Sequence, residues 1–161
     1  MLASHIIVSG ILGSQTPNYF LAAAIGFISH YIMDAIPHWD YYISKEFKTR
    51  AETEPGFIKT KFFWKEISKV MADMALGFIL ISGYFWYSGY QNIAVSAVAI
   101  FFGILPDPLQ LLYFLTKNPV LKLNFDIQHF LHKEKKPGVA FGLLTQIVVI
   151  AAAFAATLVL G

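Results

Sequence analysis

Histidine and aspartate are the residues of this chain that could carry chemistry, and one short stretch holds several of them. His30 and Asp34 are four residues apart, so they share one face of a helix, and His38 follows after a proline. Imidazole and carboxylate groups are good ligands for zinc and also bind iron or manganese. The chain has no cysteine, so a metal would be held by His, Asp or Glu. The spacing favours a site for one or two divalent ions, zinc first and manganese or iron as alternatives.

Other candidate ligands are distant in the sequence but reach the same region if the chain forms a helical bundle. His5 lies before a turn at residues 15–18 and His30 lies a similar distance after it, so an antiparallel hairpin brings both to one depth. Asp73 is expected on the first turn or so of a later helix, and Asp107 near the end of the next one, at the same end of the bundle. The predicted metal ligands are therefore His5, His30, Asp34, Asp73 and Asp107.

Four further residues could act beside these ligands. His38 is predicted as a catalytic group or an additional ligand, and Asp40 could orient it as a hydrogen-bonded carboxylate. His129 is predicted as a late ligand or general acid, and His132 could form a ligand pair with it.

Each candidate also has an ordinary structural interpretation, and these alternatives stay open at the level of sequence. They require several unrelated polar groups to lie at one depth by coincidence, whereas a metal site explains why the groups converge. The ordinary interpretations are a satisfied interfacial histidine for His5, a hydrogen bond within one helix for His30 and Asp34, an ion pair with Lys69 for Asp73, a turn or cap for Asp107, and a solvated basic loop for His129 and His132.

Composition and charge place these residues in a membrane protein. Hydrophobic residues make up 57% of the chain, and the mean hydropathy is +0.58. All twelve Lys and Arg residues lie within 45–69 and 117–136, and basic loops of this kind stay in the cytoplasm. We expect an integral protein of the inner membrane, in contact with lipid. The net charge of +2 is too small and too segregated to indicate nucleic-acid binding, and the oligomeric state is not predicted.

The elements that position the candidate residues are expected to be helices throughout. The fold class is an all-α integral membrane bundle of about five helices in one domain, 1–161, whose first two helices form a hairpin.

Residues 2–14 are short for a full crossing, and no basic region precedes them, so a cleaved signal peptide is not expected. Aromatic residues alternate with lysines over 57–65, which suits either the lipid headgroup region or a solvated loop. The expected segments are a helical hairpin (1–38), a cytoplasmic or interfacial loop (39–67), a second hairpin (68–116), a basic cytoplasmic loop (117–137) and a last transmembrane helix (138–160).

Three segments carry a resemblance to a known family. These are the early apolar helix with His5, the stretch FISHYIMDAIPHWD at 27–40 and the stretch GILPD at 103–107. Together they resemble the membrane-bound metal-dependent hydrolases, a small inner-membrane family also described as LexA-binding. The stretch around His30 and Asp34 is also distantly similar to zinc-dependent phospholipase C. The resemblance implies a metal-dependent hydrolase whose substrate is unassigned.

The function we expect is metal-dependent hydrolysis at the cytoplasmic interface, on a phosphoester of a lipid or a lipid-linked substrate. The lysines and aromatic residues of the first basic segment could hold an anionic headgroup. The alternatives are a non-catalytic metal-binding protein and a structural or partner-binding protein whose polar cluster locks the bundle. An ion or proton relay would need polar groups across the full depth, whereas the far half offers only Ser, Tyr and similar groups. A structural cluster predicts no bound metal and tolerance of Asp34→Asn.

Overall fold

The computed structural model describes residues 2–39, 45–131 and 138–160, and these residues form helices and no β-strand. The all-helical fold class is confirmed, but this part of the chain contains eight α-helices rather than about five. The helices are α1 (Leu2–Gly13), α2 (Tyr19–Ala35), α3 (Lys45–Thr53), the 3-10 helix η1 (Phe57–Lys59), α4 (Lys61–Ser88), α5 (Ile93–Ile104), α6 (Pro106–Thr116), α7 (Pro119–Leu131) and α8 (Val139–Leu160).

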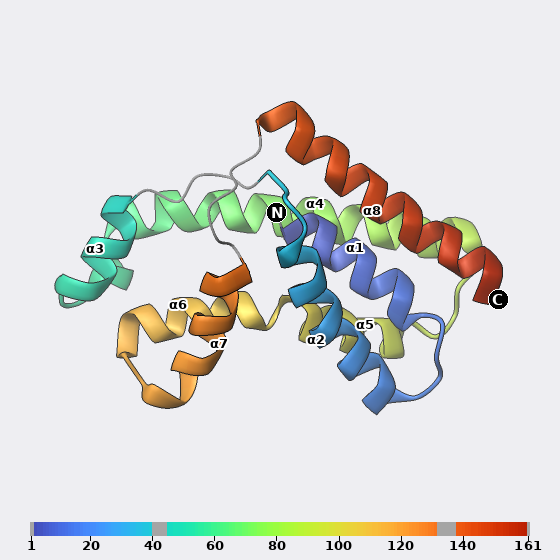
Figure 1. Ribbon diagram of the computed structural model, residues 1–161, viewed down its shortest axis with the longest axis horizontal. Coiled ribbons are helices and arrows are strands. Elements are labelled where there is room, and N and C mark those ends of the chain that lie inside the picture. Colours follow the sequence, from blue (N-terminus) through green and yellow to red (C-terminus); the bar gives the residue numbers. More distant parts are fainter. Residues whose placement is uncertain (1, 40–44, 132–137, 161) are drawn as a thin grey trace.

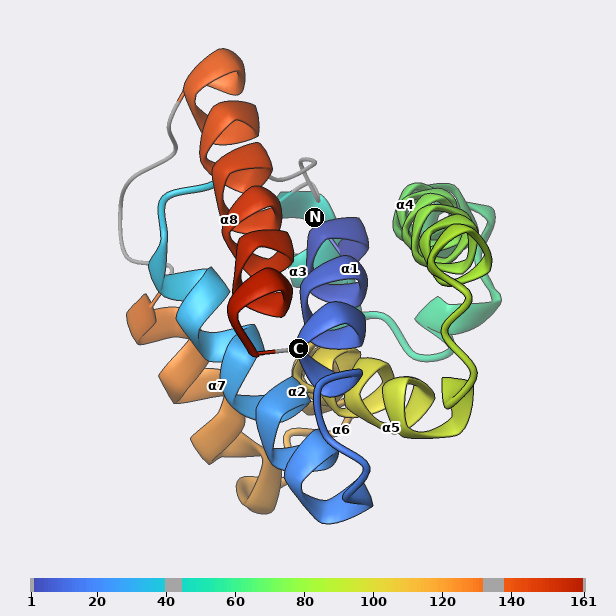
Figure 2. The ribbon, with the colours of Figure 1, turned by 90° about the vertical axis from the view of Figure 1, so that its right-hand side faces the viewer.

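The first helix, α1, lies at the centre of the bundle. It packs against α2, α4, α5 and α8, and Figure 2 shows it between α4 and α8. Every residue of α1 is buried except Leu12, which is half-buried. Its length is about 18 Å at 1.5 Å per residue, well short of the roughly 30 Å hydrocarbon core of a bilayer. The largely apolar sequence of α1 therefore reflects burial by other helices and not a membrane crossing of its own.

The first two helices form a hairpin, as the turn residues predict. Asn18 caps α2, because its side-chain oxygen accepts hydrogen bonds from the backbone N–H groups of Phe20 and Leu21 at 2.9 and 3.0 Å. The helix ends at Ala35, and Ile36 has an extended backbone because Pro37 follows it. Figure 1 shows α2 returning from the turn past α1. This return brings His30 close to His5, with ring centroids 4.5 Å apart.

Glycines let α2 and α5 approach each other closely. A Cβ atom at Gly26 would collide with the backbone carbonyl of Ala99 on α5. A Cβ atom at Gly103 would lie 2.6 Å from the Ser9 hydroxyl oxygen of α1, so three helices meet at this point. The close packing places the carbonyl of Gly103 beside His30, one turn after Gly26.

Three helical segments are long and apolar enough to cross a membrane: Lys61–Ser88, Ile93–Thr116 and Val139–Thr157. The second of these combines α5 and α6, which meet at Leu105. Large apolar side chains such as Ile79, Leu80 and Ile147 point outward from these segments and are exposed. An apolar exterior of this kind is typical of a protein that is surrounded by lipid.

Both segments predicted as loops contain helices, which corrects the boundaries predicted from the sequence. The segment 39–67 contains α3, η1 and the first turns of α4, and 117–137 contains α7. Helix α4 begins at Lys61 because the Thr60 hydroxyl caps it, accepting the N–H of Phe63 at 3.1 Å. The charged residues of these segments suggested loops, but on each helix they occupy only part of the surface.

A second apolar cluster, separate from the bundle core, lies at the basic end of the molecule. It contains Phe47, Phe57 and Phe63, packed against the second half of α6 at Leu111, Phe114 and Leu115. The alternation over 57–65 therefore arises because Phe57 and Phe63 are buried in this cluster while the lysines point outward. The two basic segments meet here, because the Lys117 ammonium lies 2.6 Å from the Glu52 carboxylate.

Candidate metal site

His30 is fully buried on α2, and its two ring nitrogens have different surroundings. Nδ1 lies 2.7 Å from the carbonyl oxygen of Gly103. Because a carbonyl only accepts hydrogen bonds, Nδ1 carries the proton. Nε2 lies 3.2 Å from a carboxylate oxygen of Asp34 and 3.6 Å from one of Asp107. In the neutral ring Nε2 holds a lone pair, which can accept a hydrogen bond or bind a metal ion.

Asp34 lies between two histidines. Its second carboxylate oxygen is 3.4 Å from Nε2 of His5, whose ring centroid is 4.5 Å from that of His30. The side chains of Asp34 and His5 are 3% and 4% exposed, so both are shielded from water. Buried charges of this kind are costly unless they are paired or bind a metal. Helices α1 and α2 thus supply three of the predicted ligands at one point.

Three contacts between these polar atoms have the separation expected for two ligands of one ion. Ligand atoms at about 2.0–2.2 Å from one tetrahedral ion lie about 3.3–3.6 Å from one another. The contacts of Asp34 with His5 and His30, and of His30 with Asp107, measure 3.2–3.6 Å. The structure therefore brings together four of the five predicted ligands: His5, His30, Asp34 and Asp107.

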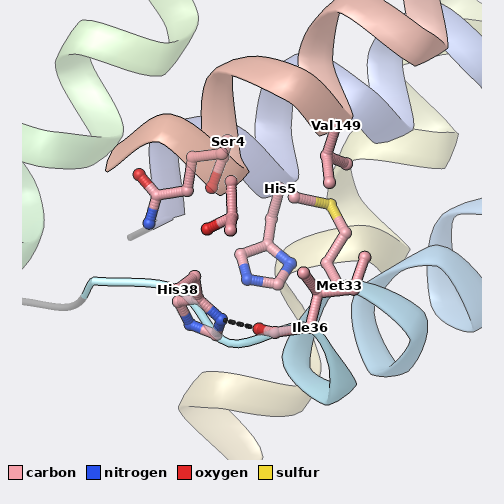
Figure 3. Close-up of a pocket in the computed structure, with 8 residues that line it drawn as sticks. Ser4, His5, Met33, Ile36, His38 and Val149 are labelled. Atoms are coloured by element: carbon pink, nitrogen blue, oxygen red, sulfur yellow. Dashed lines mark hydrogen bonds between the residues drawn. The ribbon is translucent and has the colours of Figure 1, made fainter. Parts of the chain in front are cut away.

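His38 lies beside His5, and both line a small pocket (Figure 3). Its Nδ1 is 2.8 Å from the carbonyl oxygen of Ile36, and its ring centroid is 6.3 Å from that of His5. His5, Asp34 and His38 each offer one ligand atom within 4.8 Å of the others. His38 is therefore placed to extend the site on the pocket side. The pocket is lined by Ser4, His5, Met33, Ile36, His38, Thr145, Gln146 and Val149.

Helix α8 fixes the segment that carries His38. The Thr145 hydroxyl donates a hydrogen bond to the carbonyl of Pro37 at 2.7 Å, and the Gln146 amide donates to that of Trp39 at 2.5 Å. Gly142 leaves room for this approach, since a Cβ atom there would collide with the backbone of Trp39. The last helix thus positions His38 although it contributes no predicted ligand.

Asp73 has a different place from the one predicted. Because α4 begins at Lys61, Asp73 lies about three turns into the helix and not on its first turn. A carboxylate oxygen of Asp73 accepts the backbone N–H of Ala3 at 3.1 Å, at the start of α1. Lys69, its alternative partner, lies 2.8 Å from Glu66 instead. In this structure Asp73 caps the central helix, where a negative charge is favourable.

The site includes a residue that was not predicted from the sequence. Gln128 on α7 is 1% exposed, and its amide nitrogen lies 3.1 Å from Nε2 of His30 and 3.4 Å from the Asp107 carboxylate. Its neighbour His129, the predicted general acid, points outward and stacks on Phe125, with ring centroids 5.8 Å apart. One helical position separates the two directions, so the prediction chose the wrong one of two adjacent residues.

A signal for Gln128 was present in the sequence. Asn124 lies one turn earlier and shares the face of Gln128. The Asn124 side chain accepts the Tyr31 hydroxyl at 2.7 Å and donates to the carbonyl of Pro106 at 3.0 Å. Two amides at this spacing mark a polar helix face, which could be read only once 119–131 was recognised as a helix. Asp40 and His132, the other two candidates, lie outside the described residues.

Asp107 is the most exposed of the four grouped ligands. The Asp107 side chain is 37% exposed, whereas those of His30 and Asp34 are 0% and 3% exposed. The donor set is thus buried at His5, His30 and Asp34 and reaches the surface at one carboxylate.

Comparisons with known proteins found no matching family model, curated protein or solved structure. The geometry of the site is therefore the basis for its chemistry.

Proposed function

We propose that this chain is a membrane-embedded metal-dependent hydrolase that acts at the cytoplasmic interface. One or two divalent ions, zinc first and manganese or iron as alternatives, would be held by His5, His30, Asp34 and Asp107. The observation that carries this proposal is the acceptor nitrogen of His30, which faces two carboxylates in a buried position.

The donor set fits a divalent ion. Two imidazoles and two carboxylates are a common set for zinc and also suit iron or manganese. Metal-binding histidines usually donate their other ring N–H to a carbonyl or carboxylate, and Nδ1 of His30 donates in this way to Gly103. Gln128 has a similar supporting position, since its amide donates to Asp107. The Gln128 amide oxygen is buried and has no hydrogen-bond partner among the described residues, so it can accept a hydrogen bond from a ligand.

The residues around the donor set can bind substrate and move protons. A bound divalent ion lowers the pKa of its water toward neutrality and polarises a phosphoryl oxygen. His38 borders the pocket beside His5 and can exchange a proton with a substrate there. The half-exposed Asp107 marks the direction from which a substrate would enter.

A phosphoester of a lipid or a lipid-linked compound is the substrate class that we favour. The site lies between the apolar core of the bundle and the basic end that contains Lys117 and Arg50. A headgroup phosphate at the membrane surface would meet lysines there while its acyl chains stay in the bilayer. We further propose that the protein lies in the inner membrane with this basic end in the cytoplasm.

Metal content of the purified protein tests this proposal. In detergent, mass spectrometry is expected to find a stoichiometric zinc, manganese or iron signal that is lost in His30→Gln and Asp34→Asn. His129→Gln is a matched control, because this exposed histidine lies outside the donor set and its loss is expected to leave the metal in place.

Two results would overturn the proposal. One is the absence of metal in the intact protein after incubation with zinc and manganese. The other is retention of metal by both folded site variants. Either result would leave a protonated His30 paired with the carboxylates, which is a structural polar cluster. Thermal unfolding of each variant confirms that it is folded.

A further inference from the structure

Helix α7 exposes apolar side chains that nothing in the described part of the chain covers. Val120, Leu123 and Phe130 are 81%, 68% and 67% exposed, and Ile127 is 38% exposed. At about 100° per residue these four side chains fall in one sector about 80° wide. Scattered exposed apolar residues are normal on a protein surface, but an ordered stripe of this kind marks a binding surface.

Apart from Pro119 at its start, the remaining exposed residues of α7 form a separate polar sector. On the helical wheel this sector is about 60° wide and lies beside the apolar sector; it contains Lys122, Asp126 and His129. Lys122 and Asp126 form an ion pair at 2.6 Å, with side chains 57% and 51% exposed. The exposed surface of α7 is thus divided lengthwise into an apolar half and a charged half. A helix immersed in lipid or in water on all exposed sides would not show this division, whereas a helix at the membrane surface does.

The inward face of α7 is firmly attached to the rest of the molecule. Phe125 stacks on Tyr113 of α6 with ring centroids 4.7 Å apart. Asn124 binds Tyr31 and Pro106, and Gln128 binds His30. The orientation of α7 is therefore fixed, and its apolar sector faces a constant direction.

The position and direction of α7 also suit the membrane surface. The helix follows the candidate span Ile93–Thr116 after two residues, so it begins where that span ends. Figure 1 shows α4 running along the length of the molecule while α7 crosses its direction. In Figure 2, α4 is seen along its axis while α7 is seen from the side. A helix at the end of a span and across its direction lies along the bilayer plane.

We infer that α7 binds the lipid bilayer as an interfacial helix, with Val120, Leu123, Ile127 and Phe130 inserted between the headgroups and acyl chains. The charged sector faces water, and the inward face supplies Gln128 to the candidate metal site. This inference stands independently of the proposed hydrolase activity, because it concerns where α7 lies and not what the site binds.

Labelling at single cysteines tests this placement, and the chain suits the experiment because it contains no cysteine. We would attach an environment-sensitive fluorophore to Leu123→Cys and Phe130→Cys in the apolar sector. Lys122→Cys and Asp126→Cys, on the same helix, are the matched controls. Each variant is reconstituted in vesicles of phosphatidylethanolamine and phosphatidylglycerol and exposed to aqueous iodide or to lipids with a nitroxide on the acyl chain.

The apolar-sector labels are expected to show blue-shifted emission, quenching by the nitroxide lipids and protection from iodide. The control labels are expected to show emission typical of water, quenching by iodide and little quenching by the nitroxide lipids. Equal iodide quenching of both sectors would overturn the inference, since α7 would then lie in water. Equal nitroxide quenching of both would also overturn it, since α7 would then be immersed in the acyl region. Disulfide-linked dimers of Leu123→Cys in the membrane would overturn it in favour of a second copy covering this face. All four positions are exposed, and thermal unfolding confirms that each labelled variant is folded.

Discussion

At the scale of single residues, the atoms that surround the two ring nitrogens of His30 determine the chemistry. Its Nδ1 is held by Gly103, so the ring cannot turn to present a donor to the carboxylates of Asp34 and Asp107. In a neutral His30 the Nε2 lone pair faces these carboxylates, and the Gln128 amide lies 3.1 Å from it. A metal ion bound at Nε2 would also neutralise the two carboxylates, and the separations between the polar atoms are large enough to admit one.

Gln128 is expected to support the metal site without being a ligand. Replacing it with alanine removes its amide from Asp107 and His30. Changes to residues that support metal ligands usually cost about 10- to 100-fold in metal affinity. We therefore expect Gln128→Ala to bind zinc about 10- to 100-fold more weakly in a competition titration with a chelator.

The control for this prediction is Gln91→Ala. Gln91 is an exposed amide in the turn after α4, and its side chain bonds only the nearby carbonyl of Gly89 among the contacts described. Its removal is expected to leave zinc affinity unchanged. Equal affinities for Gln128→Ala and the parent protein would show that the amide plays no part in the site.

Asp73 is expected to stabilise the fold and not to bind metal. Its carboxylate accepts the N–H of Ala3 at the start of α1, and loss of a helix cap costs about 0.5–2 kcal/mol. Asp73→Ala should therefore lower the unfolding temperature in detergent, whereas Asp73→Asn keeps an acceptor oxygen and should lower it less. Both variants should retain their metal. Loss of metal from folded Asp73→Asn would instead restore Asp73 to the ligand set predicted from the sequence.

The sequence predicted most of the candidate site at this scale. His5, His30, Asp34, His38 and Asp107 are brought together because a proline break and a symmetric hairpin, both visible in the sequence, determine their depth. The position of Asp73 along its helix was predicted wrongly because α4 begins at the Thr60 cap, inside the segment that was predicted as a loop. Gln128 was not predicted because a neutral amide indicates a metal site less strongly than a histidine does. The direction of a side chain on α7 depends on packing that the sequence alone does not specify.

At the scale of elements, close helix packing holds the ligands in register. Gly26 touches the backbone of Ala99, and His30 follows one turn later on the same helix. A methyl group at position 26 must push α2 away from α5, and overpacking of this kind costs about 1–3 kcal/mol. We expect Gly26→Ala to lower the unfolding temperature and to weaken metal binding, because His30 loses its contact with Gly103.

Gly83→Ala is the matched control for this prediction. Gly83 lies on α4, where an added Cβ atom meets nothing within 4 Å. Alanine is favoured over glycine inside helices by about 0.5–1 kcal/mol, so this variant should be as stable as the parent or slightly more stable. If Gly26→Ala matches Gly83→Ala in both measurements, the close approach of α2 and α5 is not required for the site.

The helices predicted best are those whose environment is uniform along their length. The hairpin α1–α2, the turn after Ser88 and the last helix α8 follow from apolar runs bounded by Gly, Pro and Asn. The helices α3 and α7 were predicted as loops because their charged residues dominate a short sequence. They are helical because each buries apolar residues in a tertiary contact: Phe47 of α3 in the second cluster, and Phe125 of α7 on α6. Contacts between segments this distant are not visible in local periodicity.

At the scale of the whole molecule, the site lies at the boundary between two apolar clusters. On α4, Met74 packs on the bundle core and Ile67 on the second cluster, with Asp73 between them. Along the next span, Ile104 packs on the core and Leu111 on the second cluster, with Asp107 between them. The second cluster thus lies on the side of these polar residues that faces the basic end. If the core is the part within the bilayer, the site lies at headgroup depth, where a lipid phosphate is found.

The topology of the chain decides which compartment this site faces. The ion pair of Lys117 with Glu52 brings both basic segments to one end, and the turn at Gln91 lies beyond the far end of α4. Because basic segments stay in the cytoplasm, a membrane-impermeant maleimide should label Gln91→Cys in intact spheroplasts. It should label Thr53→Cys and Asn118→Cys only after the membrane is disrupted. The reverse pattern would place the site on the outer face of the membrane, away from cytoplasmic substrates. Labelling of all three positions from one side would show that α4 and the segment Ile93–Thr116 do not cross the bilayer as a pair. The exposed apolar surface of these helices would then have to be covered by protein instead of lipid.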